Sequence, residues 1–249
     1  MSTGRTEGIV LRSRPFGEAD LIIEFLTRDS GVRPAFAKSP RKIKSRFGAS
    51  LEPFTHGRIS LLGKEDQHLP KLTQSDIIRP FQDLRENSGG FTQACEMARL
   101  VLKLFPERVA APSQSGTSKT FDLMLWGLDG LEREPASTFV PLAFRLRLMA
   151  LAGYAPSLEG CVRCGGHSET FYPRDGALLC RDCQKDPGLK LIISAALKNL
   201  LKSLLAFPLE KLNRIKPGPA LLAEMKGFVE MHQREAVNPG PVLKTKTIQ

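Results

Sequence analysis

Hydrophobic and polar residues alternate with the short period of β-strands through the first 80 residues of the chain. The alternation predicts five strands, at residues 7–12, 21–26, 32–37, 58–62 and 68–78. Residues 27–31 predict a hairpin turn between the second and third strands, where Gly31 can adopt a positive φ. Because no helix separates these strands, they favour a small antiparallel barrel over a parallel sheet.

Beyond residue 80 the hydrophobic residues recur every three or four positions, which is the period of a helix. The predicted helices span residues 91–105, a stretch capped by Thr117 or Ser118 that reaches residue 131, and residues 138–152, 195–207 and 219–237. Ser194 would cap the fourth of these helices. The predicted fold class is therefore α+β and multidomain, with a five-stranded oligonucleotide-binding (OB) barrel at residues 1–80 and a helical bundle at residues 81–249.

Composition and charge restrict the class of protein further. With 249 residues, 41% of them hydrophobic and 25% charged, the chain can bury a core and is neither disordered nor fibrous. Apolar runs such as residues 142–152 are interrupted by arginines, and residues 1–7 contain no apolar segment of a signal peptide. We therefore expect a soluble cytoplasmic protein without a membrane partner.

The formal charge of +10 is concentrated at the two ends of the chain. Residues 1–80 carry 14 Lys and Arg against nine Asp and Glu, and residues 184–249 carry 11 against five. Residues 38–46 hold five cations and no acid, and Pro40 predicts that they form a loop. Flexible cations can follow a phosphate backbone and release its counterions, whereas the alternative is a solvated loop that binds nothing. The predicted DNA contacts in this region are Lys38, Arg41, Lys42, Lys44 and Arg46.

Base stacking on an aromatic ring would add to these charge contacts. Most phenylalanines of the predicted barrel fall at positions expected in its core. Only Phe47, which follows Arg46 in the basic loop, is predicted to stack on a base.

Four cysteines form two C-x-x-C pairs that are separated by fifteen residues, which is the spacing of a zinc ribbon. They are Cys161, Cys164, Cys180 and Cys183. Residues 157–187 are therefore predicted to be an inserted four-cysteine module that resembles a zinc ribbon. Four thiolates leave no open coordination position, so we expect one structural Zn²⁺ ion. Disulfides are disfavoured because no signal peptide is visible, and a redox site would need only one C-x-x-C pair.

A catalytic zinc site is a competing interpretation. His167 and Glu169, followed by the second C-x-x-C pair, imitate the signature of zinc-dependent nucleobase deaminases. Only ten residues separate Glu169 from Cys180, Leu179 stands where that signature has proline, and the first cysteine pair would have no role. With no Walker A, H-E-x-x-H or G-x-S-x-G motif and no paired carboxylates, the sequence predicts no catalytic residue. A zinc-ribbon nucleic-acid-processing enzyme and a protein-interaction scaffold stay as alternatives.

The order of the motifs resembles the bacterial recombination mediator and DNA repair family RecO. The resemblance rests on residues 7–12, 16–20, 27–31, 37–48 and 51–54 and on residues 151–156 before the cysteines, and it extends over about residues 6–237. One departure is Ser39-Pro40, where the family pattern has a small glycine-containing turn.

The resemblance implies a non-enzymatic, nucleoid-associated protein with no small-molecule substrate. It implies binding of single- and double-stranded DNA, annealing of complementary strands and association with RecR. It also implies contact with single-stranded DNA-binding protein, so that RecA can be loaded. Arg12 and Arg14 would join the basic loop in this role if they lie on the same barrel face.

Overall fold

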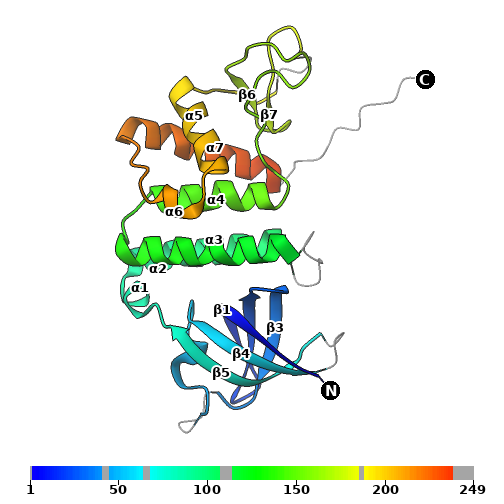
Figure 1. The fold of residues 1–249 in the computed structure, drawn as a ribbon, viewed down its shortest axis with the longest axis vertical. Helices are drawn as coiled ribbons and strands as arrows, with labels where there is room; N and C mark the ends of the chain where they lie inside the picture. Colours follow the sequence, from blue (N-terminus) through cyan, green and yellow to red (C-terminus); the bar gives the residue numbers. More distant parts are fainter. Residues whose placement is uncertain (1, 41–44, 64–67, 107–113, 185–187, 238–249) are drawn as a thin grey trace, which may run out of the picture. The chain divides into compact units, whose positions relative to one another are not determined.

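The computed structural model describes residues 2–40, 45–63, 68–106, 114–184 and 188–237 of the chain (Figure 1). The chain divides into two compact units, Met1–Phe144 and Arg145–Gln249. The domain division predicted at residue 80 lies within the first of these units, and it stays a prediction. No helix among the described residues is long and apolar enough to cross a membrane.

Five strands of the first unit close into a barrel in the order β1-β2-β3-β5-β4. They are β1 (Ser2–Phe16), β2 (Asp20–Thr27), β3 (Gly31–Ala37), β4 (His56–Gly63) and β5 (Lys71–Arg79). Neighbouring strands are antiparallel, except that β3 meets β5 in parallel at Phe36 and Lys71 and so closes the barrel. The predicted five-stranded OB-like barrel is confirmed, and Gly31 has the expected positive φ of +67°.

Strand β1 is much longer than the six residues predicted, because its two halves pair with different strands. Residues 2–9 pair with β4, and residues 8–16 pair with β2. The register with β2 shifts between Val10 and Arg12, which marks a β-bulge that bends the strand around the barrel. Val10 is fully buried in the core, whereas the side chains of Arg12 and Arg14 are about half exposed on the outside.

Apolar side chains from every strand fill the barrel. The short helix η1 (Gly48–Leu51) adds Leu51 and closes one part of the interior. The buried cluster consists of Val10, Ile23, Phe25, Ala35, Ala37, Phe47, Leu51, Ile59 and Leu72. The strand period therefore directs a continuous core inward and leaves alternate positions on the outer surface.

After the barrel the chain is mainly helical, and helices occur in both compact units. The helices are α1 (Gln82–Glu86), α2 (Ser88–Leu104), α3 (Gln114–Arg133), α4 (Phe139–Leu151), α5 (Ala195–Ala206), α6 (Leu209–Leu212) and α7 (Pro219–Val237). The predicted helices are confirmed within a few residues, except that α3 begins before Thr117. The hydroxyl oxygen of Ser194 accepts a hydrogen bond from the N–H of Leu197 at 3.0 Å, so Ser194 caps α5 as predicted.

Helix α3 is tied to the barrel by two arginines within the first unit. Arg28 donates hydrogen bonds to Glu7 of β1 at 3.2 Å and to Asp122 of α3 at 2.8 Å. Arg79, at the end of β5, pairs with Asp129 and, at 2.6 Å, with Glu132 of α3. These ion pairs join the barrel to α3 within the first compact unit.

Candidate metal centre and nucleic-acid interface

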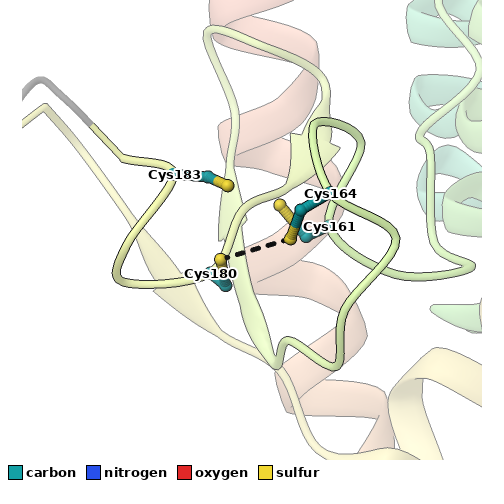
Figure 2. Close-up of side chains that lie close together, drawn as sticks. All are labelled: Cys161, Cys164, Cys180 and Cys183. Atoms are coloured by element: carbon teal, nitrogen blue, oxygen red, sulfur yellow. Dashed lines mark hydrogen bonds between the residues drawn. The ribbon is translucent and has the colours of Figure 1, made fainter.

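The four cysteines of the two C-x-x-C pairs gather their sulfur atoms around a common point (Figure 2). All four Sγ atoms lie within 4.8 Å of one another, and those of Cys164 and Cys180 are 3.7 Å apart. In a tetrahedral site with zinc–sulfur bonds of about 2.3 Å, neighbouring sulfur atoms are about 3.8 Å apart. The cluster therefore has the size and the ligand set for one metal ion.

Two short turns and a hairpin bring the cysteines together. In the first turn, the N–H of Gly165 donates to the carbonyl of Cys161 at 2.8 Å, and Gly165 has a φ of +74° that favours glycine. In the second, the N–H groups of Cys183 and Gln184 both donate to the carbonyl of Cys180. Strands β6 (Thr170–Tyr172) and β7 (Ala177–Leu178) form the hairpin between the turns, and β8 (Leu191–Ile192) pairs with β6.

Hydrogen bonds within the cluster shift the pKa values of Cys161 and Cys183 in opposite directions. Hydrogen bonds from backbone N–H groups, chiefly that of Cys180, lower the pKa of Cys161 to about 6. Hydrogen bonds with the neighbouring thiols, chiefly that of Cys180, raise the pKa of Cys183 to about 12, because they favour its protonated form. A divalent cation would replace the shared protons and hold all four sulfur atoms as thiolates.

The side chains of Arg12 and Arg14 lie on the outer face of the barrel. The sequence predicts that they contact DNA if they share a barrel face with the basic loop. The Nη2 atom of Arg12 is 2.8 Å from Glu24 Oε1, and the Nη2 atom of Arg14 is 3.3 Å from the same oxygen. The Arg12 and Arg14 side chains are 51% and 53% exposed, whereas that of Glu24 is 12% exposed. The hydrogen bond to Glu24 raises the pKa of Arg12, so its guanidinium stays charged. Two solvent-facing cations thus share one buried carboxylate.

Only part of the predicted basic loop can be placed. Lys38 and Arg46 are exposed, and Arg46 donates to the carbonyl of Leu72 at 3.3 Å. Arg41, Lys42 and Lys44 lie outside the described residues.

Phe47 does not occupy the position expected of a stacking residue. Its side chain is 4% exposed and belongs to the barrel core, because the following helix η1 turns it inward. The Arg46 guanidinium lies 4.8 Å from the ring centre. The interpretation of Phe47 as a base-stacking residue is therefore corrected. An exposed aromatic side chain, Phe16, lies at the end of β1, a position that the sequence did not single out for base stacking.

Comparison with known proteins gives the same order of parts. The model of the family "Recombination protein O N terminal" matches residues 1–81, and "Recombination protein O C terminal" matches residues 90–244. The chain is 40% identical over 233 residues to the DNA repair protein RecO of Thermodesulfovibrio yellowstonii, covering 91% of this chain and 90% of that protein. The chain belongs to the RecO family. The DNA repair protein RecO of Rubrobacter xylanophilus is 36% identical over 218 residues, which cover 84% of this chain and 83% of the relative.

Membership in the RecO family confirms the resemblance seen in the motif order and assigns the chain to DNA repair and recombination. The N-terminal RecO model covers the barrel with its basic loop, and the C-terminal RecO model covers the four cysteines. Both candidate sites therefore lie within the regions that the RecO models match.

Proposed function

We propose that this chain is a recombination mediator that binds single- and double-stranded DNA and anneals complementary strands. With RecR it helps to load RecA onto DNA covered by single-stranded DNA-binding protein, and it acts at the nucleoid in the cytoplasm. It performs no chemical step, because its work is to neutralise phosphates and bring strands together.

The observation that carries this proposal is the pair of half-exposed guanidiniums on the β1–β2 face. The sequence adds five cations at residues 38–46, of which Lys38 and Arg46 are exposed. Arg12 and Arg14 share the single buried carboxylate of Glu24, so uncompensated positive charge faces solvent there. Guanidinium groups bind phosphate oxygens well, and contacts of this kind carry little sequence information. The barrel therefore suits a ligand that is recognised by its backbone charge.

The proposed metal is one structural Zn²⁺ ion held by the four cysteines. It would supply a fixed tetrahedral centre that joins the two turns, and a set of four thiolates leaves no position for water or substrate. Among the described residues, the four cysteines form one group that could hold a metal ion. The zinc-ribbon module would thus stabilise the second unit, which argues against the alternative of a zinc-ribbon nucleic-acid-processing enzyme.

Strand annealing tests the proposal and separates it from its alternatives. Two complementary oligonucleotides, labelled with a donor and an acceptor dye, are mixed with and without the purified chain at low and moderate salt. We expect annealing many-fold faster than the spontaneous rate, with intact, unmodified DNA. Cleaved or deaminated product would establish an enzyme, and a chain that neither binds nor anneals DNA would leave a protein-interaction scaffold.

A further inference from the structure

Two phenylalanines that are distant in sequence lie together on the outer face of the barrel. The rings of Phe16, at the end of β1, and Phe36, in β3, meet edge to face with centres 5.8 Å apart and planes at 86°. Phe16 is 51% exposed, and Phe36 is partly exposed. An edge-to-face contact leaves most of the aromatic surface of a pair uncovered, so these rings stay open to a ligand.

The register of the strands places this pair beside the two arginines. Ile22 of β2 pairs with Arg14 on β1 and with Phe36 on β3, so these three side chains form one row across the face. The adjacent row contains Arg12 and Glu24. Cations and aromatic rings are therefore next to each other on the surface formed by β1, β2 and β3, which we name the β1–β3 face.

Acidic groups on the β1–β3 face are engaged by the protein itself. Both arginines contact the Glu24 carboxylate, and Asp20 accepts a hydrogen bond from the N–H of Ser39 at 2.6 Å. The guanidinium of Arg14 makes one hydrogen bond, at 3.3 Å, among those found between described residues, and a guanidinium has five N–H donors. Donors thus stay available for an anionic ligand next to the rings.

We propose that Phe16 and Phe36 form a base-stacking platform that gives the barrel a preference for single-stranded DNA over duplex. Arg12 and Arg14 contact the phosphates of the same strand. Stacking on a ring needs an unpaired base, and it tolerates every base because each has a π-face. A duplex offers the arginines its phosphates but offers the rings no free base. This inference rests on the proposed DNA-binding function and adds the residues that distinguish the two forms of DNA.

Phe16→Leu in the full chain tests the platform, since Phe16 is exposed and its replacement leaves the core intact. Affinity is measured by fluorescence anisotropy for a single-stranded oligothymidine and for a duplex. We expect a loss of about five- to 150-fold for the single strand, which is the range for removing one base–aromatic stack. Duplex affinity and the salt dependence of both should be unchanged. Phe207→Leu, at a 42% exposed phenylalanine of the second unit, is the matched control and should bind both ligands as the native chain does.

Phe16→Trp provides a second measurement that a purely structural role of Phe16 would not affect. The native chain has a single tryptophan, Trp126, which is 6% exposed in α3 and cannot stack on a base. The variant should keep native affinity, and its added emission should be quenched as the single strand saturates it. The duplex should leave this emission unchanged.

The outcomes separate the platform from the proposed function. Native single-strand affinity in Phe16→Leu without quenching in Phe16→Trp would overturn the platform, while salt-dependent DNA binding would leave the proposed function standing. Equal losses for single strand and duplex would also overturn it. A native chain that binds neither ligand would overturn both proposals.

Discussion

The protonation of Cys161 and that of Cys183 depend on hydrogen bonds within the four-cysteine cluster. Backbone N–H groups lower the pKa of Cys161 to about 6, and neighbouring thiols raise that of Cys183 to about 12. Such a cluster gains most from a cation that compensates all four sulfur atoms at once. Structural zinc sites of this kind contribute about 10–16 kcal/mol of apparent binding free energy at neutral pH.

Loss of one thiolate should therefore abolish tight zinc binding. In Cys161→Ser we expect the zinc content of dialysed protein, measured by atomic emission, to fall from one ion per chain to near zero. Cys95→Ala, which changes a cysteine of α2 far from the cluster in sequence, should retain one ion. Equal zinc contents in the two variants would show that these four cysteines do not bind the metal.

His232 predicts a pH dependence of stability in the second unit. His232 is 2% exposed and packs against the rings of Phe171 and Phe228. Its Nε2–H donates a hydrogen bond to the carbonyl oxygen of Tyr154 at 2.8 Å. Burial lowers the pKa of His232 below 6.5, so the folded state takes up a proton less readily than the unfolded state. Its contribution is constant above about pH 6.5 and declines as the pH falls towards the folded pKa.

Thermal unfolding at pH 7.5 and pH 5.5 measures this effect. The native chain should unfold at a lower temperature at pH 5.5, and His232→Gln should show a smaller difference between the two pH values. His68→Gln, at an exposed histidine, should keep the native difference. A full difference in His232→Gln would assign the pH dependence to other groups.

The sequence predicts the four metal ligands but not the contact between Phe16 and Phe36. The first depends on local turns, whereas the second depends on how distant strands pair. Each C-x-x-C turn is local, so the spacing alone shows that two sulfur atoms lie together. Phe16 and Phe36 meet because β1 and β3 both pair with β2, and their contact depends on the register of both pairings. Phe47 follows a cation in the sequence, yet helix η1 turns its ring into the core.

At the level of the elements, Gly31 and Ser39 both adopt a positive φ at turns of the barrel. Gly31 has a φ of +67° in the hairpin between β2 and β3, whereas Ser39 adopts a φ of +56° at the start of the basic loop. The left-handed region disfavours residues with a Cβ atom. Ser39 thus holds a strained backbone conformation that a glycine would adopt more easily.

Opposite substitutions at these two turns should have opposite effects. Ser39→Gly keeps the N–H bond to Asp20 and should stabilise the chain by about 0.5–1 kcal/mol. Gly31→Ala should destabilise it by about 1 kcal/mol or more. Urea unfolding of both variants measures the free energies. Destabilisation by Ser39→Gly would mean that the serine side chain makes a contact worth more than the strain.

Strand β1 shows why element boundaries are harder to predict than element types. Alternation in residues 7–12 identifies the strand, but its full span of Ser2–Phe16 depends on two pairing partners. The bulge near Leu11 follows from barrel closure, and local sequence does not encode it. Helices α2, α4 and α7 are predicted to within a few residues, since their hydrophobic period and their end signals are local.

At the scale of the whole molecule, the first unit is larger than the barrel. Arg28 joins β1 to α3 through Glu7 and Asp122, and its guanidinium lies 4.4 Å from the centre of the Phe121 ring. Because the Arg28 side chain is 38% exposed, solvent screens these ion pairs and each is worth less than a buried pair.

Removal of the Arg28 charge should weaken the first unit modestly. Arg28→Met keeps an apolar stem over Phe121, so we expect a loss of about 0.5–1 kcal/mol in urea unfolding. Arg58→Met, at an exposed position of β4, should change stability by less than about 0.5 kcal/mol. Equal losses of stability in the two variants would show that the ion pairs of Arg28 do not stabilise the first unit.

We propose that the basic loop and the barrel bind DNA by neutralising its phosphates. The most direct measurement is the affinity for a single-stranded oligonucleotide over a series of salt concentrations. It compares the native chain with a variant carrying Arg41→Ala, Lys42→Ala and Lys44→Ala. A control variant with Arg99→Ala, Lys103→Ala and Lys119→Ala removes the same charge from helices α2 and α3.

We predict that the native chain binds with a steep dependence of log affinity on log salt. The loop variant should bind more weakly, and its slope should be shallower by about 2, since each lost phosphate contact on a single strand reduces the slope by about 0.7. The helix variant should keep the native slope. Unchanged affinity and slope in the loop variant would contradict the claim that this loop binds DNA.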